Sequence, residues 1–318
     1  MTVKRIQLTI LKANRCKILV MSEKGSHNVA IPGVYQVFRP DGAEIPLVID
    51  SPHSGRIYPA DFRYACPSGV LERAEDNHVD TLLDGVTGRG ATLLCALFPR
   101  TYIDVNRAAY DIDTDLLAEN WPGPLMPSSR SHAGIGLIRR LVKPGVPVYD
   151  RRLSVAEVQN RLDRYYHPYH AALKTIQDDL HYRFGAMWHI NAHSMPSAAA
   201  LSTGPHNLHY LQPDFVLGDR DGTSCDLDFT HSLRDCLNAM GYRVAINNPY
   251  KGVEIVRRSA RPSAGRHSIQ MEISKALYWN ETLNEKNSNF NALKADLDTL
   301  IAFAARYVSD HLVNLAAD

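Results

Sequence analysis

Short apolar runs alternate with amphipathic stretches along this chain, and this alternation limits the folds that it can adopt. A run of about four to eight apolar residues is typical of a buried strand, and an apolar residue every three or four positions is typical of a helix. The strand-like runs are residues 34–38, 46–50, 91–98, 101–104, 187–191, 215–219, 242–246 and 269–273. The helical stretches between them are residues 75–88, 154–183, 229–240 and 290–315. This order predicts an α/β sandwich with a largely parallel sheet.

Length and patterning favour one domain. The 318 residues could form one large α/β domain or two smaller ones. Residues 31–318 contain no internal repeat and no change of composition that would mark a second domain, so we expect a single domain there. Residues 1–30 are basic and lack the long apolar segment of a secretory signal. We expect them to form a loosely ordered extension.

Charge and cysteine content exclude several classes of protein. The net charge is +1, with 35 basic and 34 acidic residues, whereas general binding to nucleic acid or to an anionic membrane needs a basic excess. No apolar run approaches the roughly 18–20 residues of a membrane span. The five cysteines are scattered and contain no C-x-x-C pair, which argues against a disulfide framework and a cysteine zinc site. A cytoplasmic protein with a small-molecule partner fits best.

Two of the predicted strands lead into a histidine followed by a serine, at residues 53–54 and 193–194. Ligands of open α/β sheets bind at the carboxyl ends of the strands, where both histidines are expected. Catalytic zinc commonly binds two histidines and one carboxylate and keeps a position for water. His53 and His193 therefore predict a metal site, although each could also be an ordinary turn histidine.

The third metal ligand should be a carboxylate that follows the first histidine. Asp76, at the start of the predicted helix 75–88, is the first choice and Glu75 the second. Asp80 lies one helical turn further on and could instead orient a ligand. The sequence alone leaves these alternatives open.

Glu272 is a candidate for the general base. It lies in a predicted strand, residues 269–273, that is otherwise apolar except for Gln270. A carboxylate in a buried strand is costly unless it is paired or functional. Glu272 could accept the proton of an attacking water, or it could belong to a salt bridge in the core.

A candidate anion-binding pair, Asn106-Arg107, follows the predicted strand 101–104. The planar guanidinium of arginine binds carboxylates with two parallel hydrogen bonds. A structural role for Arg107 is the alternative, in which it would pair with Asp104, Asp111 or Asp113.

Other catalytic patterns are absent from the sequence. It contains no G-x-S-x-G elbow, no G-x-G-x-x-G fingerprint and no P-loop lysine. Ser54 and Ser194 are therefore interpreted as turn or hydrogen-bonding residues rather than nucleophiles.

Seven short segments resemble, in order, the N-formylglutamate amidohydrolase family. They are Asp50-Ser51-Pro52-His53-Ser54-Gly55 with Tyr58-Pro59, Glu75-Asp76-Asn77-His78-Val79-Asp80, Asp104-Val105-Asn106-Arg107, Tyr166-His167-Pro168-Tyr169-His170, His193-Ser194-Met195-Pro196, Asn248-Pro249-Tyr250-Lys251-Gly252 and Gln270-Met271-Glu272-Ile273. The resemblance covers about residues 35–280 and implies a fold like that of zinc carboxypeptidases and aspartoacylases. In that fold a mixed sheet of about eight strands lies between helices, as a three-layer α/β/α sandwich.

The resemblance also implies site roles. His53, Asp76 and His193 would bind one Zn²⁺ per chain, and Glu272 would be the general base. In the carboxypeptidases the histidine and glutamate ligands stand three residues apart, but Arg56 occupies that position here. The carboxylate ligand must therefore come from further along the chain, as Asp76 does.

The resemblance finally implies a substrate. Asn106 and Arg107, helped by Arg139 from the loop 109–147, would bind the carboxylate of an N-acyl amino acid. The expected reaction is zinc-dependent hydrolysis of N-formyl-L-glutamate to formate and L-glutamate, at the end of histidine breakdown. The alternatives are a zinc acylase or peptidase for another N-acyl substrate, and a metal-binding scaffold without catalysis.

Overall fold

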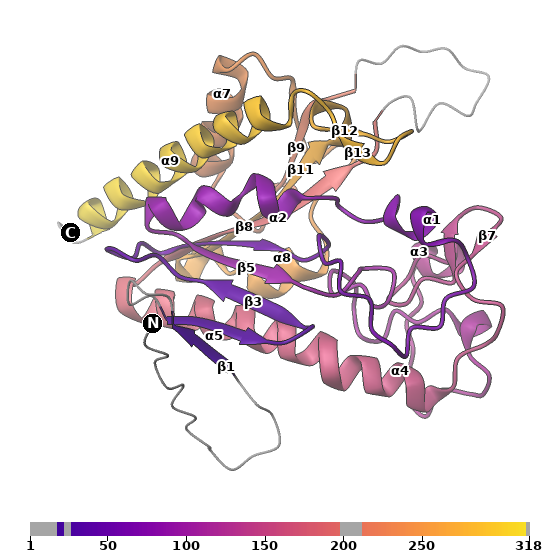
Figure 1. The fold of residues 1–318 in the computed structure, drawn as a ribbon. Coiled ribbons are helices and arrows are strands. Elements are labelled where there is room, and N and C mark those ends of the chain that lie inside the picture. The colour runs from indigo at the N-terminus through magenta and orange to yellow at the C-terminus, as the bar shows by residue number, and fades with distance from the viewer. Residues whose placement is uncertain (1–17, 22–26, 198–211, 316–318) are drawn as a thin grey trace, which may run out of the picture.

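The computed structural model describes residues 18–21, 27–197 and 212–315, and it contains a nine-stranded mixed sheet between two layers of helices (Figure 1). The strands of this sheet are β1 (Ile18–Met21), β2 (His27–Ile31), β3 (Tyr35–Phe38), β4 (Leu47–Ser51), β5 (Thr92–Ala96), β8 (Met187–Met195), β9 (Phe215–Gly218), β10 (Val244–Ile246) and β11 (Arg266–Ser274). Their order across the sheet is β1-β2-β3-β5-β4-β8-β11-β9-β10. The predicted α/β/α sandwich is confirmed.

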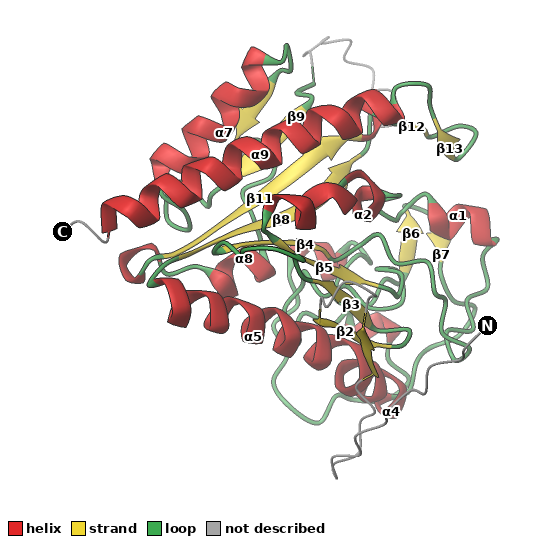
Figure 2. Ribbon diagram, turned by 60° about the vertical axis from the view of Figure 1, so that its left-hand side comes forward, coloured by secondary structure: helices red, strands yellow, loops and turns green. Residues whose placement is uncertain are grey.

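Helices cover both faces of the sheet. On one face lie α2 (Val79–Leu82), α7 (Leu227–Ala239) and α9 (Phe290–Leu315), and on the other lie α5 (His167–Phe184) and α8 (Glu254–Ser259) (Figure 2). The remaining elements are α1 (Ser68–Glu72), α3 (Ser129–His132), α4 (Val155–Arg161), four 3₁₀ turns and the small hairpins β6–β7 (Leu141–Lys143, Val146–Pro147) and β12–β13 (Trp279–Asn280, Glu285–Lys286). The two helical layers leave one edge of the sheet to long loops.

Parallel strands form the centre of the sheet. β4 pairs in parallel with β5 and β8, and β8 pairs in parallel with β11, while β3 and β9 join this group antiparallel. The carboxyl ends of the four central strands therefore meet at one edge. β8 and β11 pair over nine residues each, longer than the predicted runs 187–191 and 269–273.

Alternation along β8 and β11 gives the sheet one apolar and one polar face near this edge. Ile190, Ala192 and Met271 belong to the apolar core beneath α7 and α9. Successive side chains of a strand point to opposite faces, so the intervening polar residues share the other face. These are His189, Asn191, His193, Ser268, Gln270 and Glu272. The candidate residues on these two strands therefore lie side by side.

The long helix predicted over residues 154–183 has three parts. Its capping box is confirmed, because Ser154 and Glu157 exchange side-chain and backbone hydrogen bonds. A π-helical turn, Leu162–Tyr166, then separates α4 from α5. Pro168 has no N–H to donate to the preceding turn, which accounts for the interruption there.

Two predicted elements near the site are wrong in part. The run 101–104 is a loop, and its backbone bonds to other loops, as when Asp104 N donates to Leu137 O at 2.7 Å. Of the predicted helix 75–88, only Val79–Leu82 is α-helical, and Asp84–Arg89 is a 3₁₀ turn. His78 has a left-handed backbone (φ 58°), so a helix cannot run continuously from residue 75.

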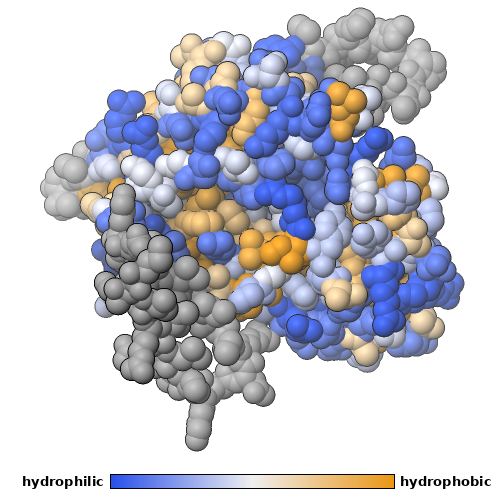
Figure 3. Space-filling model, viewed as in Figure 1, coloured by the Kyte–Doolittle hydropathy of each residue, from blue (hydrophilic) through white to orange (hydrophobic). Residues whose placement is uncertain are grey.

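The chain start and the surface complete the description. Within the predicted extension 1–30, residues 18–21 and 27–30 belong to β1 and β2, and the remainder lies outside the described residues. The domain boundary at residue 31 stays a prediction. The face seen in Figure 3 is largely hydrophilic, with small hydrophobic patches. Among the described residues, no helix is long and apolar enough to cross a membrane.

Candidate active site

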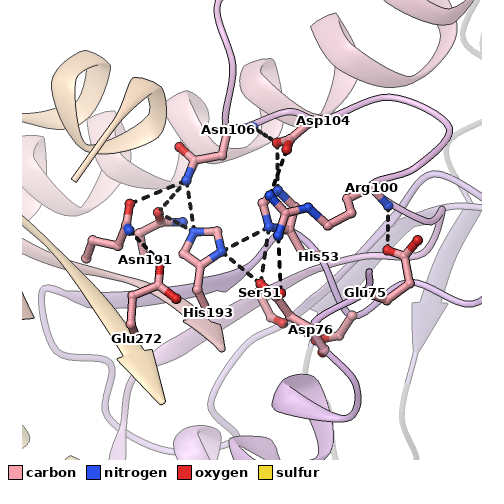
Figure 4. A network of polar contacts seen from close by, with 12 residues as sticks. Ser51, His53, Glu75, Asp76, Arg100, Asp104, Asn106, Asn191, His193 and Glu272 are labelled. Carbon is pink, nitrogen blue, oxygen red and sulfur yellow. Dashed lines mark hydrogen bonds and ion pairs between the residues drawn. The ribbon is translucent and has the colours of Figure 1, made fainter. Parts of the chain in front are cut away.

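Three buried donor atoms from distant parts of the chain point at one another (Figure 4). Asp76 Oδ2 lies 3.2 Å from His53 Nδ1 and 3.0 Å from His193 Nδ1, and the two Nδ1 atoms are 3.0 Å apart. Ligands bound at about 2.1 Å to a tetrahedral ion are separated by about 3.4 Å, close to these distances. Two imidazoles and one carboxylate in this arrangement fit a divalent metal such as zinc.

Hydrogen bonds between loops place Asp76 beside His53. Asp76 N donates to His53 O at 3.1 Å, and the hydroxyl of Ser54 donates to Asp76 O at 2.7 Å. Ser54 Oγ also accepts from the backbone N–H of Asp80 at 3.3 Å. These bonds join the turn after β4 to the segment before α2, and they occupy the hydroxyl of Ser54 within the protein.

The ring of His53 is oriented by a buried carboxylate. His53 Nε2 lies 2.7 Å from Asp104 Oδ1, so the proton is on Nε2 and Nδ1 presents a lone pair to the site. Burial alone would raise the pKa of Asp104, but His53 and Arg100 hold it well below its ordinary value. The loop that replaces the predicted strand 101–104 thus carries the carboxylate that orients His53.

His193 is oriented by an amide instead. It lies inside β8, two residues before the strand ends, and not beyond the strand as the sequence suggested. Its Nε2 is 2.7 Å from Asn191 Oδ1, while Asn191 Nδ2 donates to Asp50 Oδ1 at 2.8 Å. The amide orientation fixed by Asp50 leaves Oδ1 as an acceptor, so His193 carries its proton on Nε2 and presents Nδ1 to the site.

Asp50 anchors this network within the core. Its carboxylate also accepts from His189 Nε2 at 2.8 Å and from the hydroxyl of Tyr169 at 2.7 Å. Burial would raise the pKa of Asp50, but the hydrogen bonds from His189, Asn191 and Tyr169 lower it. Sequence reasoning missed Asp50, His189 and Asn191 as site residues, although the polar positions that alternate along β8 point to the last two.

Of the two candidate carboxylates, the structure brings Asp76 to the histidines. Glu75 turns away and accepts from Thr101 Oγ1 at 2.6 Å and from Arg100 N at 2.8 Å. Burial raises the pKa of Glu75 to about 7, although Thr101 and Arg100 act in the opposite direction. Asp80 contacts the exposed Arg56 rather than either histidine.

Arg100 is a further residue that the sequence analysis missed. Its Nη1 donates to Asp76 Oδ1 at 3.2 Å and its Nη2 donates to Asp104 Oδ2 at 2.9 Å. The signal was its position soon after the buried strand β5, at the sheet edge that carries His53. Its partners could not be read from the sequence, because both come from loops.

Glu272 is adjacent to His193 across the sheet. The two residues are register partners in β8 and β11, and Glu272 is 7% exposed. Glu272 Oε1 accepts from Gln270 Nε2 at 2.7 Å, and no basic residue in the described parts of the chain forms an ion pair with it. Burial, with a smaller contribution from Asp76, raises the pKa of Glu272, while His193 and Arg100 oppose that rise. The alternative of a core salt bridge is therefore not observed.

These residues open into a cavity of about 700 Å³ with a strongly basic lining. The three acidic residues of the lining are Asp76, Glu272 and Glu281. The eight basic ones are Arg73, Arg100, Arg107, Arg130, Arg139, Lys143, Lys251 and Lys275. Such an excess of positive charge around the three donor side chains favours an anionic ligand.

Arg107 and Arg139 are unpaired within this lining. Their Nε atoms are buried without a hydrogen-bond partner, and no carboxylate of the described residues lies within ion-pair distance of either side chain. Burial, with repulsion from Arg100, lowers the pKa of Arg139 to about 10. Burial also lowers the pKa of Arg107. Two partly buried guanidinium groups that form no ion pair are well suited to bind carboxylate.

The predicted structural pairings of Arg107 are not observed. Asp111 accepts hydrogen bonds from Ser128 and Ser131, and Asp113 pairs with Arg140. The carboxylate of Asp104 bonds to His53 and Arg100. Arg107 therefore remains available to a ligand.

Asn106 lines the cavity, but its amide is engaged within the protein. Its Oδ1 accepts from Ile255 N at 3.0 Å, and its Nδ2 donates to Asn191 Oδ1 and to Gln270 Oε1, each at 3.4 Å. These contacts hold the loop that carries Arg107 against β8 and β11.

Comparison with known proteins decides the family. The sequence model of the N-formylglutamate amidohydrolase family matches residues 45–279. The chain belongs to this family of amidohydrolases. It is 30% identical to an N-formylglutamate deformylase of Pseudomonas putida over 246 residues, which are 75% of this chain and 83% of that protein. The predicted family and enzyme class are confirmed.

Solved structures agree with this assignment. A crystal structure of N-formylglutamate amidohydrolase from Ralstonia eutropha JMP134 is 45% identical to this member of the family. It has a TM-score of 0.83, and the match covers 88% of this chain and 99% of that one. A gene product of Agrobacterium tumefaciens shares the fold, with a TM-score of 0.61 at 17% identity, over 87% of this chain and 96% of that one.

Proposed function

We propose that this chain hydrolyses N-formyl-L-glutamate to formate and L-glutamate, with one Zn²⁺ bound by His53, Asp76 and His193. The observation that carries the proposal is the convergence of these three donors beside Glu272 in a basic cavity. The names of the Pseudomonas and Ralstonia relatives support the substrate. The place of the reaction in histidine breakdown and the cytoplasmic location stay predictions.

The donor set supports zinc as the metal. Each imidazole has its Nε2 proton bound by an acceptor, Asp104 or Asn191, and keeps Nδ1 for the ion. Bound zinc supplies a polarised carbonyl and a water whose pKa falls to about 7. Everything else in the reaction is assigned to side chains of the protein.

Glu272 is the proposed proton acceptor. Its raised pKa makes its carboxylate a better base than an exposed glutamate, and Gln270 holds one of its oxygens in place. Glu272 takes a proton from the attacking water and donates it to the leaving amide nitrogen. This transfer releases the amine of glutamate and formate.

Arg107 and Arg139 are the proposed partners of substrate carboxylate. Their guanidinium groups form no ion pair within the protein, and they are repelled by neighbouring arginines such as Arg100. A substrate carboxylate would compensate this positive charge. Asn106 contributes by keeping the Arg107 loop in place, because its amide accepts from Ile255 N and donates to Gln270 Oε1.

Formate release from N-formyl-L-glutamate tests the function directly. The purified chain is assayed as isolated, after treatment with a chelator, and after zinc is restored. We expect activity to fall on chelation and to return with zinc. Full activity in protein shown by elemental analysis to be metal-free would contradict the metal assignment.

The variant E272Q tests the base. Gln can accept the hydrogen bond from Gln270 but cannot take a proton, so we expect kcat to fall by about 10²- to 10⁴-fold with zinc still bound. Wild-type turnover in E272Q would contradict the role of Glu272. A panel of N-formyl and other N-acyl amino acids separates the proposed reaction from that of a broader acylase or peptidase.

A further inference from the structure

Arg100 contacts two carboxylates of the site, Asp76 and Asp104, and both of them also contact His53. Its Nη1 contacts Asp76, which faces both histidines, and its Nη2 contacts Asp104, which orients His53. The four side chains of His53, Asp76, Arg100 and Asp104 form a closed ring (Figure 4). Moving any member of this ring displaces a proposed metal ligand.

The two oxygens of Asp76 have different partners. Oδ1 accepts from Arg100 at 3.2 Å, while Oδ2 lies 3.2 Å from His53 Nδ1 and 3.0 Å from His193 Nδ1. A carboxylate held in this way offers a metal one oxygen rather than two. The guanidinium is suited to this because its rigid fork can contact two carboxylates at fixed positions.

The backbone of the same region reinforces this geometry. Arg100 N donates to Glu75 Oε2 at 2.8 Å, and Lys275 Nζ donates to Glu75 O at 2.6 Å and to Arg73 O at 3.2 Å. The segment that carries Asp76 is therefore fixed from two sides. The guanidinium of Arg100 contacts the side chain of Asp76 directly.

We propose that Arg100 is a positioning residue of the metal centre, which holds Asp76 with a single oxygen free for the ion and fixes the ring of His53 through Asp104. The inference rests on the proposed metal site. It differs from the role given to Arg107 and Arg139, since both Nη atoms of Arg100 are already bonded to carboxylates.

Metal binding in R100K tests this role. Lysine keeps the positive charge but lacks the rigid fork, so the variant isolates geometry from charge. We expect zinc affinity, measured by competition with a chromophoric chelator, to fall about 10- to 100-fold. The visible absorption of the cobalt-substituted protein should also change, because it reports the ligand geometry. At saturating zinc the KM for N-formyl-L-glutamate should equal that of the wild type.

R107K is the matched control, because Arg107 lines the same cavity but contacts none of the three donor side chains. It should raise KM while zinc affinity and the cobalt spectrum stay unchanged. D104N is a second variant of the ring and should also weaken zinc binding. The double variant R100K/D104N should bind zinc no more weakly than the single variant with the lower affinity, since both substitutions act through one ring.

The outcomes separate the inference from the proposed function. If the wild-type chain binds no zinc, the metal site itself is wrong. If the wild type binds zinc and R100K binds it with equal affinity and an unchanged cobalt spectrum, the positioning role is refuted. A higher KM as the sole effect of R100K would assign Arg100 to substrate instead. Should R100K fail to fold, unchanged zinc binding in D104N would refute the inference.

Discussion

Replacing His170 with glutamine should remove part of the acid sensitivity of the protein. His170 is 8% exposed in α5, and its Nε2 donates to Val105 O at 2.9 Å, next to the loop of Asn106 and Arg107. Burial, with repulsion from Arg258, lowers the pKa of His170 from 6.5 to about 3. The folded protein therefore keeps this imidazole neutral at pH values where the unfolded chain protonates it.

Proton linkage gives the direction and the size of the change in the free energy of unfolding with pH. Because folding lowers this pKa, the free energy of unfolding falls as pH drops below 6.5, where the unfolded chain gains the proton. pH 5 lies about 1.5 units below the unfolded pKa, and each unit is worth about 1.36 kcal/mol. The free energy of unfolding should therefore be about 2 kcal/mol lower at pH 5 than at pH 7. Any folded pKa below about 4 gives the same figure, since the folded state is then unprotonated at pH 5.

Urea unfolding of the metal-free protein at pH 7 and pH 5 measures this difference. In H170Q the amide can still donate to Val105 O, but it does not titrate, so the loss between the two pH values should be smaller by about 2 kcal/mol. H181Q is the control, because His181 lies on the same helix, is less buried and also bonds a backbone oxygen. A pH dependence in H170Q equal to that of the wild type and H181Q would refute the argument.

Three further predictions concern caps, the buried network and the cavity. S154A removes the cap of α4 and should lower the free energy of unfolding by about 1 kcal/mol, measured by urea unfolding. Y169F removes a donor to the buried carboxylate of Asp50 and should cost about 1.5–3 kcal/mol in the same assay; an unchanged value would contradict the network. R139M should raise the KM for N-formyl-L-glutamate without lowering the melting temperature, since it removes an unpaired buried charge; a lower melting temperature would show that Arg139 stabilises the fold.

The sequence predicted those parts of the fold and site that depend on local pattern. The capping box at Ser154, the closing helix 290–315 and the runs that became β4 and β11 are set by nearby residues, and the structure confirms them. Of the site, the convergence of His53, Asp76 and His193 was also expected. The two histidines could be predicted because the ends of parallel strands meet at one edge of a sheet, whereas the choice of Asp76 over Glu75 came from the family resemblance.

The errors arose where tertiary contacts replace local preference. Thr101 has strand propensity, but its backbone N–H and hydroxyl bond to Glu75, so its segment is a loop. His193 was placed beyond the end of its strand, because a His-Ser pair resembles a turn. Pairing with β11 extends β8 to Met195 instead.

Asp104 and Arg100 could not be assigned from the sequence, because their roles depend on which loops meet above the sheet. Asp104 N donates to Leu137 O in the long loop, and the Asp104 carboxylate accepts from His53 Nε2. Arg100 contacts Asp76 only because β5 and β4 are neighbours. The order of the strands brings the two histidines together, whereas Asp76 and the orientation of His53 come from the loops between the strands. We therefore expect changes in these loops to alter the proposed metal binding and turnover even when His53, Asp76 and His193 are retained.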